Sequence, residues 1–214
     1  MPYFRLIEKD KGSTKLFVGG LHGKEGLTTI KFFKSLIPND FSNGKILIYN
    51  FDESPYISTL NKEYYNSNIG KELIAIIKKY KPDFYIELHC YNIKNYKSLV
   101  DDKRRYFQGV PPLIELNNKV LVSSVSPLIR KKYFKREDVC KIIEIPCLND
   151  DNSLKSKEFD ENLAVKTYLN FIKIIAVSKN REDFEKRVIS IYPKQVDLAI
   201  KYAKEIFGKY FPPF

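Results

Sequence analysis

The segment KLFVGGLHGKEGLTTIKFFKSL, residues 15–36, decides the fold class of this chain. Residues 15–19 are an apolar run typical of a buried strand, and a glycine-rich loop follows at 19–23. Residues 27–36 carry apolar side chains at helical spacing, and Pro38 lies just beyond them. The segment therefore predicts a strand, a loop and a helix in succession, which is the repeating unit of α/β proteins.

The same alternation continues along the rest of the chain. We expect further strands at 3–7, 45–49 and 84–88, a hairpin or two edge strands at 114–116 and 120–122, and a strand at 141–145. Helices are expected at 68–80 and 126–133, capped by Ser67 or Asn68 and by Ser126, and then from Ser156 to about 177 and from 193 to 208. Residues 92–112 are expected to be a loop. These elements predict an α/β fold with a mixed, largely parallel sheet and flanking helices.

Length and composition limit the class of protein. A chain of 214 residues predicts a single domain over 1–214, with a core at about 1–150 and C-terminal helices at about 156–208. The formal net charge is +11, but the basic residues are scattered and no RNA-binding aromatic signature or Cys/His finger spacing is present. We therefore expect a Lys-rich surface, and nucleic-acid binding stays open only as the least favoured alternative function. The absence of a long apolar run or signal-peptide pattern predicts a cytoplasmic protein without a membrane partner.

Three cysteines, Cys90, Cys140 and Cys147, are too few for a disulfide framework. Their number is typical of a protein from a reducing compartment, and we expect all three to be small buried residues. The alternative concerns Cys90 and Cys147, which lie close in sequence to candidate site residues. Thiolate ligation by these two would indicate a structural or redox site.

The chain has only two histidines, and both follow predicted strands: His22 follows 15–19 and His89 follows 84–88. In an open α/β sheet the carboxyl ends of the strands line the ligand crevice. Glu25 lies three residues after His22, so that both side chains can reach one ion. His22, Glu25 and His89 therefore predict a zinc site with an open position for water. Glu144, near the end of the strand at 141–145, is the candidate base that takes a proton from that water.

Each of these residues taken alone has an ordinary structural interpretation. A single loop histidine is more often a surface residue than a ligand, and Glu25 alone could favour a helix N-terminus. The glycines at 19, 20 and 23 are compatible with a plain turn or with a weak anion-binding loop. The joint placement of the only two histidines at two strand ends favours the metal site.

Several segments resemble the zinc carboxypeptidase superfamily, and most closely its succinylglutamate desuccinylase and aspartoacylase branch. Residues 19–25, GGLHGKE, resemble the segment G-G-x-H-G-x-E of that superfamily. Residues 60–62, LNK, fall where the branch has an Asn-Arg pair, and residues 87–89, ELH, fall where it has D-L-H. Residues 143–146, IEIP, match the segment that carries the catalytic Glu. The whole chain also resembles an archaeal, chiefly methanogen, family placed in that superfamily.

This resemblance implies a zinc-carboxypeptidase-like (phosphorylase/hydrolase-like) fold and a zinc-dependent hydrolase. The hydrolase would cleave an amide bond next to a carboxylate, in an N-acyl amino acid or a short peptide. His22, Glu25 and His89 would bind zinc, Glu144 would activate water, and Asn61 would help to hold the small anionic substrate. The expected C-terminal helices stand where the branch has a β-rich domain, which leaves a homo-oligomer open as a partner that covers the site.

Two positions depart from the pattern of that branch. Lys62 replaces an Arg, and a lysine lacks the planar fork that binds a carboxylate through two hydrogen bonds. Recognition would then be looser, or it would use Arg104, Arg105 or Arg130 instead; of these, Arg130 falls in a region where relatives carry substrate-binding groups.

Glu87 replaces an Asp in the D-L-H segment. Residues 87 and 89 point the same way on a strand, so the Glu87 carboxylate is expected to orient His89 without binding the ion itself. The replacements at 62 and 87 also keep a second hypothesis open, in which the protein binds a metal or ligand without catalysis.

Overall fold

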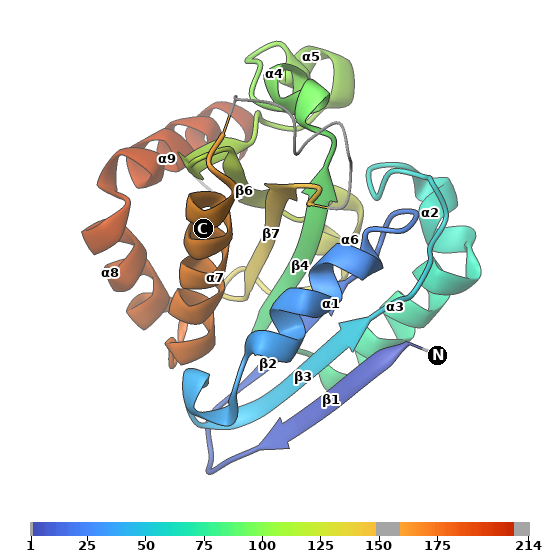
Figure 1. Cartoon of the computed structure of the whole chain (residues 1–214), viewed down its shortest axis with the longest axis vertical. Coiled ribbons are helices and arrows are strands. Elements are labelled where there is room, and N and C mark those ends of the chain that lie inside the picture. The colour runs from blue at the N-terminus through green and yellow to red at the C-terminus, as the bar shows by residue number, and fades with distance from the viewer. Residues whose placement is uncertain (1, 149–158, 208–214) are drawn as a thin grey trace.

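The computed structural model describes residues 2–148 and 159–207, which form a central sheet with helices on both faces (Figure 1). The strands are β1 (Tyr3–Glu8), β2 (Ser13–Gly19), β3 (Gly44–Asn50), β4 (Phe84–Tyr91), β5 (Ile114–Asn117), β6 (Val120–Ser124) and β7 (Val139–Pro146). The α-helices are α1 (Gly26–Ser35), α2 (Lys62–Asn66), α3 (Asn68–Tyr80), α4 (Tyr96–Leu99), α5 (Arg104–Gln108), α6 (Pro127–Tyr133), α7 (Glu161–Val177), α8 (Arg181–Ile191) and α9 (Pro193–Phe207). Two short 3-10 helices cover Pro38–Asp40 and Ile93–Asn95.

The described strands form one seven-stranded mixed sheet in the order β1-β3-β2-β4-β7-β6-β5. The four central strands, β3, β2, β4 and β7, run parallel, whereas β1 at one edge and β6 and β5 at the other run antiparallel to their neighbours. Neighbouring parallel strands end at the same edge of a sheet, so the segments that follow β2 and β4 and the end of β7 come together. The mixed sheet with flanking helices confirms that part of the expected fold.

The helices cover the sheet in two layers. Helices α1, α7, α8 and α9 pack on one face, and α2, α3 and α6 pack on the other. Strand β4 supplies both layers, because Phe84 and Ile86 face α1 and α7 while Tyr85 faces the side of α3. By the same alternation Glu87 and His89 project on the side of Tyr85, and both are buried.

The helix starts agree with the sequence where side-chain caps were expected. The Ser67 hydroxyl accepts the N–H of Gly70 at 3.0 Å, and the Ser126 hydroxyl accepts the N–H of Leu128 at 3.3 Å. The helix expected from Ser156 is α7, which begins at Glu161; position 156 lies outside the described residues.

The segment 92–112 is not the plain loop that we expected. It contains a 3-10 helix, α4 and α5, and its apolar residues pack with the end of β4 and with β6. Helices of four and five residues are too short to produce a periodic apolar pattern in the sequence.

The cysteine expectation is right for Cys140, which is buried and free, and wrong for the other two. Cys90 and Cys147 form a disulfide between the end of β4 and the residue that follows β7. They lie 57 residues apart in sequence, and only the adjacency of the two parallel strands brings them together.

Candidate metal centre

The turn after β2 places His22 and Glu25 in contact. Gly20 has a φ of 72°, and a Cβ there would lie 2.0 Å from the carbonyl oxygen of Phe51, so this position requires glycine. Glu25 stands directly before α1, and its Oε1 accepts the backbone N–H of His22 at 2.8 Å. This local hydrogen bond holds the carboxylate back over the loop that carries the histidine.

Strand β4 places His89 against the same carboxylate. Its Nδ1 lies 3.1 Å from Oε1 of Glu25, and its Nε2 lies 3.2 Å from Oε2 of Glu87. Glu87 in turn accepts the hydroxyl proton of Tyr85 at 2.7 Å through its Oε1. A carboxylate that accepts a hydrogen bond from Nε2 fixes the proton on that nitrogen and leaves the lone pair of Nδ1 for a metal.

The ligand atoms of His22, Glu25 and His89 all lie within 4.8 Å of one another. Nδ1 of His22 is 3.8 Å from Oε2 of Glu25, and the two imidazole rings stack with centroids 4.9 Å apart. Two ligand atoms on one tetrahedral zinc ion are about 3.4 Å apart when each bond is about 2.1 Å. The donor set of two imidazoles and one carboxylate is that of a zinc site, and its atoms must move closer by up to about 1.4 Å to bind one ion.

The electrostatics of Glu25 and His89 agree with a cation site. Burial favours the neutral form of Glu25, but the attraction of His89 and of the nearby His22, together with the hydrogen bond from His89, outweighs it and lowers the pKa of Glu25 to about 2. Burial likewise opposes protonation of His89, yet the Glu25 carboxylate and the bond to Glu87 raise its pKa well above the ordinary value. A buried carboxylate needs a positive partner, and a metal ion would meet that need in place of a proton.

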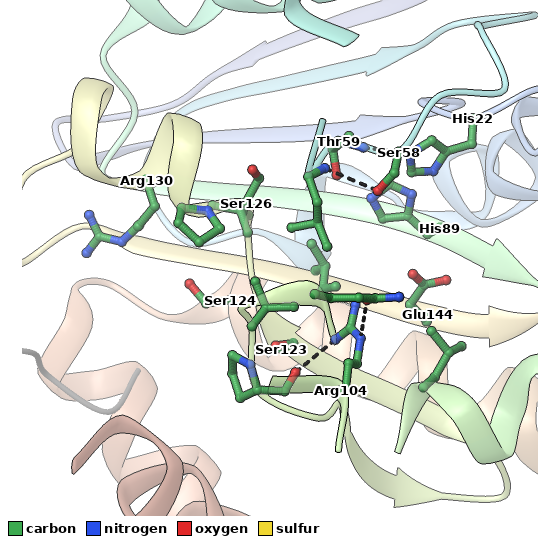
Figure 2. A pocket seen from close by; sticks show the side chains of 18 of the residues that line it. His22, Ser58, Thr59, His89, Arg104, Ser123, Ser124, Ser126, Arg130 and Glu144 are labelled. Carbon is green, nitrogen blue, oxygen red and sulfur yellow. Dashed lines mark hydrogen bonds between the residues drawn. The ribbon is translucent and has the colours of Figure 1, made fainter. Parts of the chain in front are cut away.

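Glu144 lies beside this cluster on the neighbouring strand. The register of β4 and β7 pairs His89 with Glu144, and both side chains line one cavity (Figure 2). Burial raises the pKa of the Glu144 carboxyl, and the nearby charge of Glu25 adds to this effect. Within residues 2–148 and 159–207 the carboxyl makes no hydrogen bond and no ion pair, so its oxygens are available to a water or substrate.

The cavity has a volume of about 220 Å³ and begins at the two histidines and Glu144. The rest of its polar lining comes from Ser58, Thr59, Arg104, Gln108, Ser123, Ser124, Ser126, Arg130 and Lys131, and its apolar lining from Leu60, Leu99, Val110, Pro111, Val125, Pro127 and Ile142. A second, more open hollow shares His22, Leu99 and Glu144 with the cavity and is also lined by Glu25 and the Cys90–Cys147 pair. The candidate site thus borders two hollows, which could receive the two parts of one substrate.

The remaining predicted site residues lie apart from this cluster. Asn61 is exposed and caps α2, where its Oδ1 accepts the N–H of Glu63 at 3.0 Å. Asn61 and Lys62 line an adjoining, more open hollow, which shares Ser58, Leu60 and Gln108 with the cavity at the histidines, and they do not line that cavity themselves.

Arg130 lines the cavity only with part of its side chain. Its guanidinium donates to the carbonyl oxygens of Lys135, Arg136 and Asp138 at 2.7 to 3.1 Å and points away from Glu144 (Figure 2). These bonds fix the loop between α6 and β7, so in this conformation Arg130 has a structural role.

Sequence reasoning did not place Arg104, Ser123 and Ser124 at the site, although it named Arg104 among three candidate arginines. Arg104 is on α5, in the segment that was expected to be a loop, and the two serines end β6. The only sequence signal was the basic run at 103–105, which does not show which of its members faces inward.

The part of the chain that the structure describes contains no helix long and apolar enough to cross a membrane. No solved structure matches the chain, so the expected carboxypeptidase-like fold has no structural counterpart among them. A protein of Methanocaldococcus jannaschii, "Uncharacterized protein MJ0501", is 41% identical over 207 residues, which cover 92% of this chain and 93% of that protein.

The comparisons correct the family expected from the sequence. Residues 10–208 match the family described as "Uncharacterized protein conserved in archaea (DUF2119)", and the match does not extend to the zinc carboxypeptidase superfamily or to its succinylglutamate desuccinylase/aspartoacylase branch. Short motifs such as residues 19–25 are compatible with more than one family, whereas the family match covers most of the chain. By that match, and by its similarity to the Methanocaldococcus protein, the chain belongs to the archaeal family DUF2119.

Proposed function

We propose that the protein is a zinc-dependent hydrolase that cleaves an amide bond next to a carboxylate, in an N-acyl amino acid or a short peptide. One observation carries the proposal: three convergent ligand atoms of His22, Glu25 and His89 lie beside the available carboxyl of Glu144, at the edge of a cavity. Two histidines and one glutamate are a ligand set of catalytic zinc sites, which keep a position for water.

The roles of the residues follow from their positions. His22, Glu25 and His89 would hold the ion, and Glu87 would keep His89 in the required tautomer. When bound, zinc lowers the pKa of a water to about 7 and polarises a carbonyl group. Glu144, whose pKa burial raises, would take a proton from the attacking water and pass it to the departing amine nitrogen.

The cavity supports a small substrate. Its volume of about 220 Å³ suits a single amino-acid residue better than a polymer, and its lining combines hydroxyl-bearing and charged side chains with apolar ones. The second hollow offers space for the group on the other side of the cleaved bond. A short N-acyl or peptide substrate would therefore extend from one hollow into the other, with its cleaved bond next to His89 and Glu144.

Metal analysis and turnover test this proposal in two steps. Protein purified without chelator is expected to contain, or to take up, one zinc per chain, and His22→Ala should lose it. Glu144→Gln should keep the zinc and lose hydrolysis of a panel of N-acetyl amino acids and dipeptides by about 100-fold or more. Glu72→Gln, an exposed change on α3, is the matched control.

Two outcomes would contradict it. A chain that takes up no zinc has no metal centre of this kind. A chain that binds zinc through these residues and hydrolyses no member of the panel is a metal- or ligand-binding protein without catalysis.

A further inference from the structure

We propose that Arg104 is the residue that binds the substrate carboxylate and so selects acids over neutral analogues; this rests on the proposed function. The expected pair for this task, Asn61 and Lys62, lines an adjoining, more open hollow and not the cavity itself, and Arg130 is held by three backbone carbonyls. Lys131 also lines the cavity but is exposed to solvent, whereas Arg104 is half-buried and combines its position on the cavity with donors that the described part of the protein does not use.

Two contacts hold the Arg104 guanidinium in place. Nε donates to Oε1 of Gln108 at 2.9 Å, and one terminal nitrogen donates to the carbonyl oxygen of Pro111 at 2.9 Å. An arginine has five N–H donors, so these bonds leave three, including both on the second terminal nitrogen. A guanidinium that is fixed by two bonds loses little freedom when its remaining edge binds a carboxylate.

The position of Arg104 relative to Glu144 supports a ligand between the protein groups. Both side chains line the cavity, and Figure 2 shows Arg104 reaching into it from the side of Ser123, across from the two histidines. Burial lowers the pKa of the Arg104 guanidinium and the nearby charge of Glu144 opposes this effect, yet the two groups form no ion pair. The free donors of Arg104 are therefore not engaged by Glu144. A substrate carboxylate can accept hydrogen bonds from them while Glu144 remains available to the attacking water.

The side chains around Arg104 limit the class of substrate that the cavity can bind. Ser123 and Ser124 line the same cavity, and their hydroxyls make no hydrogen bond within residues 2–148 and 159–207. Leu99, Val110 and Ile142 supply an apolar wall. A single negative charge fits better than a double one, because Glu144 and Glu25 lie nearby. The geometry points to a monocarboxylate on a residue with a small apolar side chain.

Binding of two matched probes to the full chain tests the inference. N-acetyl-L-valine and N-acetyl-L-valinamide differ only in the charge of the group that Arg104 would bind. We expect the acid to bind at least about 10-fold more tightly than the amide, both to the metal-free and to the zinc-loaded protein, as measured by calorimetry or NMR titration. The metal-free arm separates binding by Arg104 from direct binding of the carboxylate to zinc.

The variants identify the residue. Arg104→Gln should remove most of the preference for the acid, and Arg104→Lys should keep part of it, since a lysine retains the charge but not the fork. Arg105→Gln is the matched control, because Arg105 pairs with Glu205 and does not line the cavity. Thermal unfolding of each variant shows whether it is folded, and the lysine variant gives a second test should the glutamine variant be unstable.

The outcomes distinguish the inference from the proposed function. Equal binding of acid and amide, an unchanged preference in Arg104→Gln, or tighter binding of inorganic phosphate than of the acid would overturn the role of Arg104. A preference for the acid that depends on Arg104 in a chain without zinc uptake or hydrolysis would uphold this role and refute the hydrolase.

Discussion

His89 and Glu144 are register partners on the neighbouring parallel strands β4 and β7, and both side chains face one cavity. This pairing joins a candidate metal ligand to a candidate proton acceptor through the main-chain hydrogen bonds of the sheet. Neither side chain depends on a loop for its position, and groups on strands are held more rigidly than groups on loops. The pairing makes the proposed site testable by substitutions that leave the sheet intact.

Glu87→Gln is expected to weaken zinc binding by about 10-fold to 100-fold without loss of the fold. The carboxylate of Glu87 accepts the Nε2 proton of His89, and an amide in its place can present a donor to the same nitrogen. Competition with a chelator of known affinity measures the change. Tyr85→Phe, which removes one hydrogen bond to Glu87, should have a smaller effect, and equal zinc affinity in all three proteins would contradict the role of Glu87.

Zinc should stabilise the folded chain. A ligand that binds only the folded state adds about 2.7 kcal/mol to the free energy of unfolding when its concentration is 100 times its Kd. Urea unfolding with and without zinc measures this difference, which should disappear in His22→Ala. Equal stabilisation of the variant would place the ion elsewhere.

The buried lysine of β7 should make stability depend on pH. Burial lowers the pKa of Lys141 to about 7, below its value in the unfolded chain, so the unfolded chain binds more protons between about pH 7 and 10.5. The free energy of unfolding is therefore expected to rise with pH across this range. Lys15, whose pKa burial lowers to about 8, acts in the same direction.

Lys141→Met should remove part of that rise and increase stability at pH 7 by on the order of 2 kcal/mol. Urea unfolding at pH 7 and pH 9.5 provides the measurement, with the exposed Lys71→Met as control. If the methionine variant showed the same pH dependence as the wild type, another group would have to account for it.

The bond between Cys90 and Cys147 should contribute about 2–4 kcal/mol to the free energy of unfolding, because it closes a long loop in the unfolded chain. Reduction of the wild type, or the double change of both cysteines to serine, should lower the urea midpoint. A reductant should have no further effect on the double variant. Identical midpoints for oxidised and reduced wild type would show that the bond does not restrict the unfolded chain.

Much of the local structure could be predicted from the sequence. The apolar runs at 15–19, 84–88 and 141–145 are strands, and Ser67 and Ser126 cap helices as expected, because these signals depend on near neighbours. The positions of His22 and His89 at strand ends follow from the same signals. Their convergence required only that β2 and β4 be adjacent, as they are.

What could not be predicted depends on contacts between distant segments. Strand β1 precedes β2 but pairs with β3 at the edge, and nothing in its residues indicates that partner. The disulfide likewise requires the adjacency of β4 and β7. Arg104 and Arg105 are neighbours with the same chemistry, and only the packing of α5 turns one toward the cavity and the other toward Glu205.

The Glu144 carboxyl makes no hydrogen bond within the described ranges, which has an evolutionary consequence. A residue that supports no neighbour can be replaced at little cost in stability, so a single substitution at position 144 could end hydrolysis while the zinc stays bound. Enzymes and non-catalytic receptors could then arise from one ancestor by one codon change. The residue at this position in each archaeal relative would sort the family into the two groups.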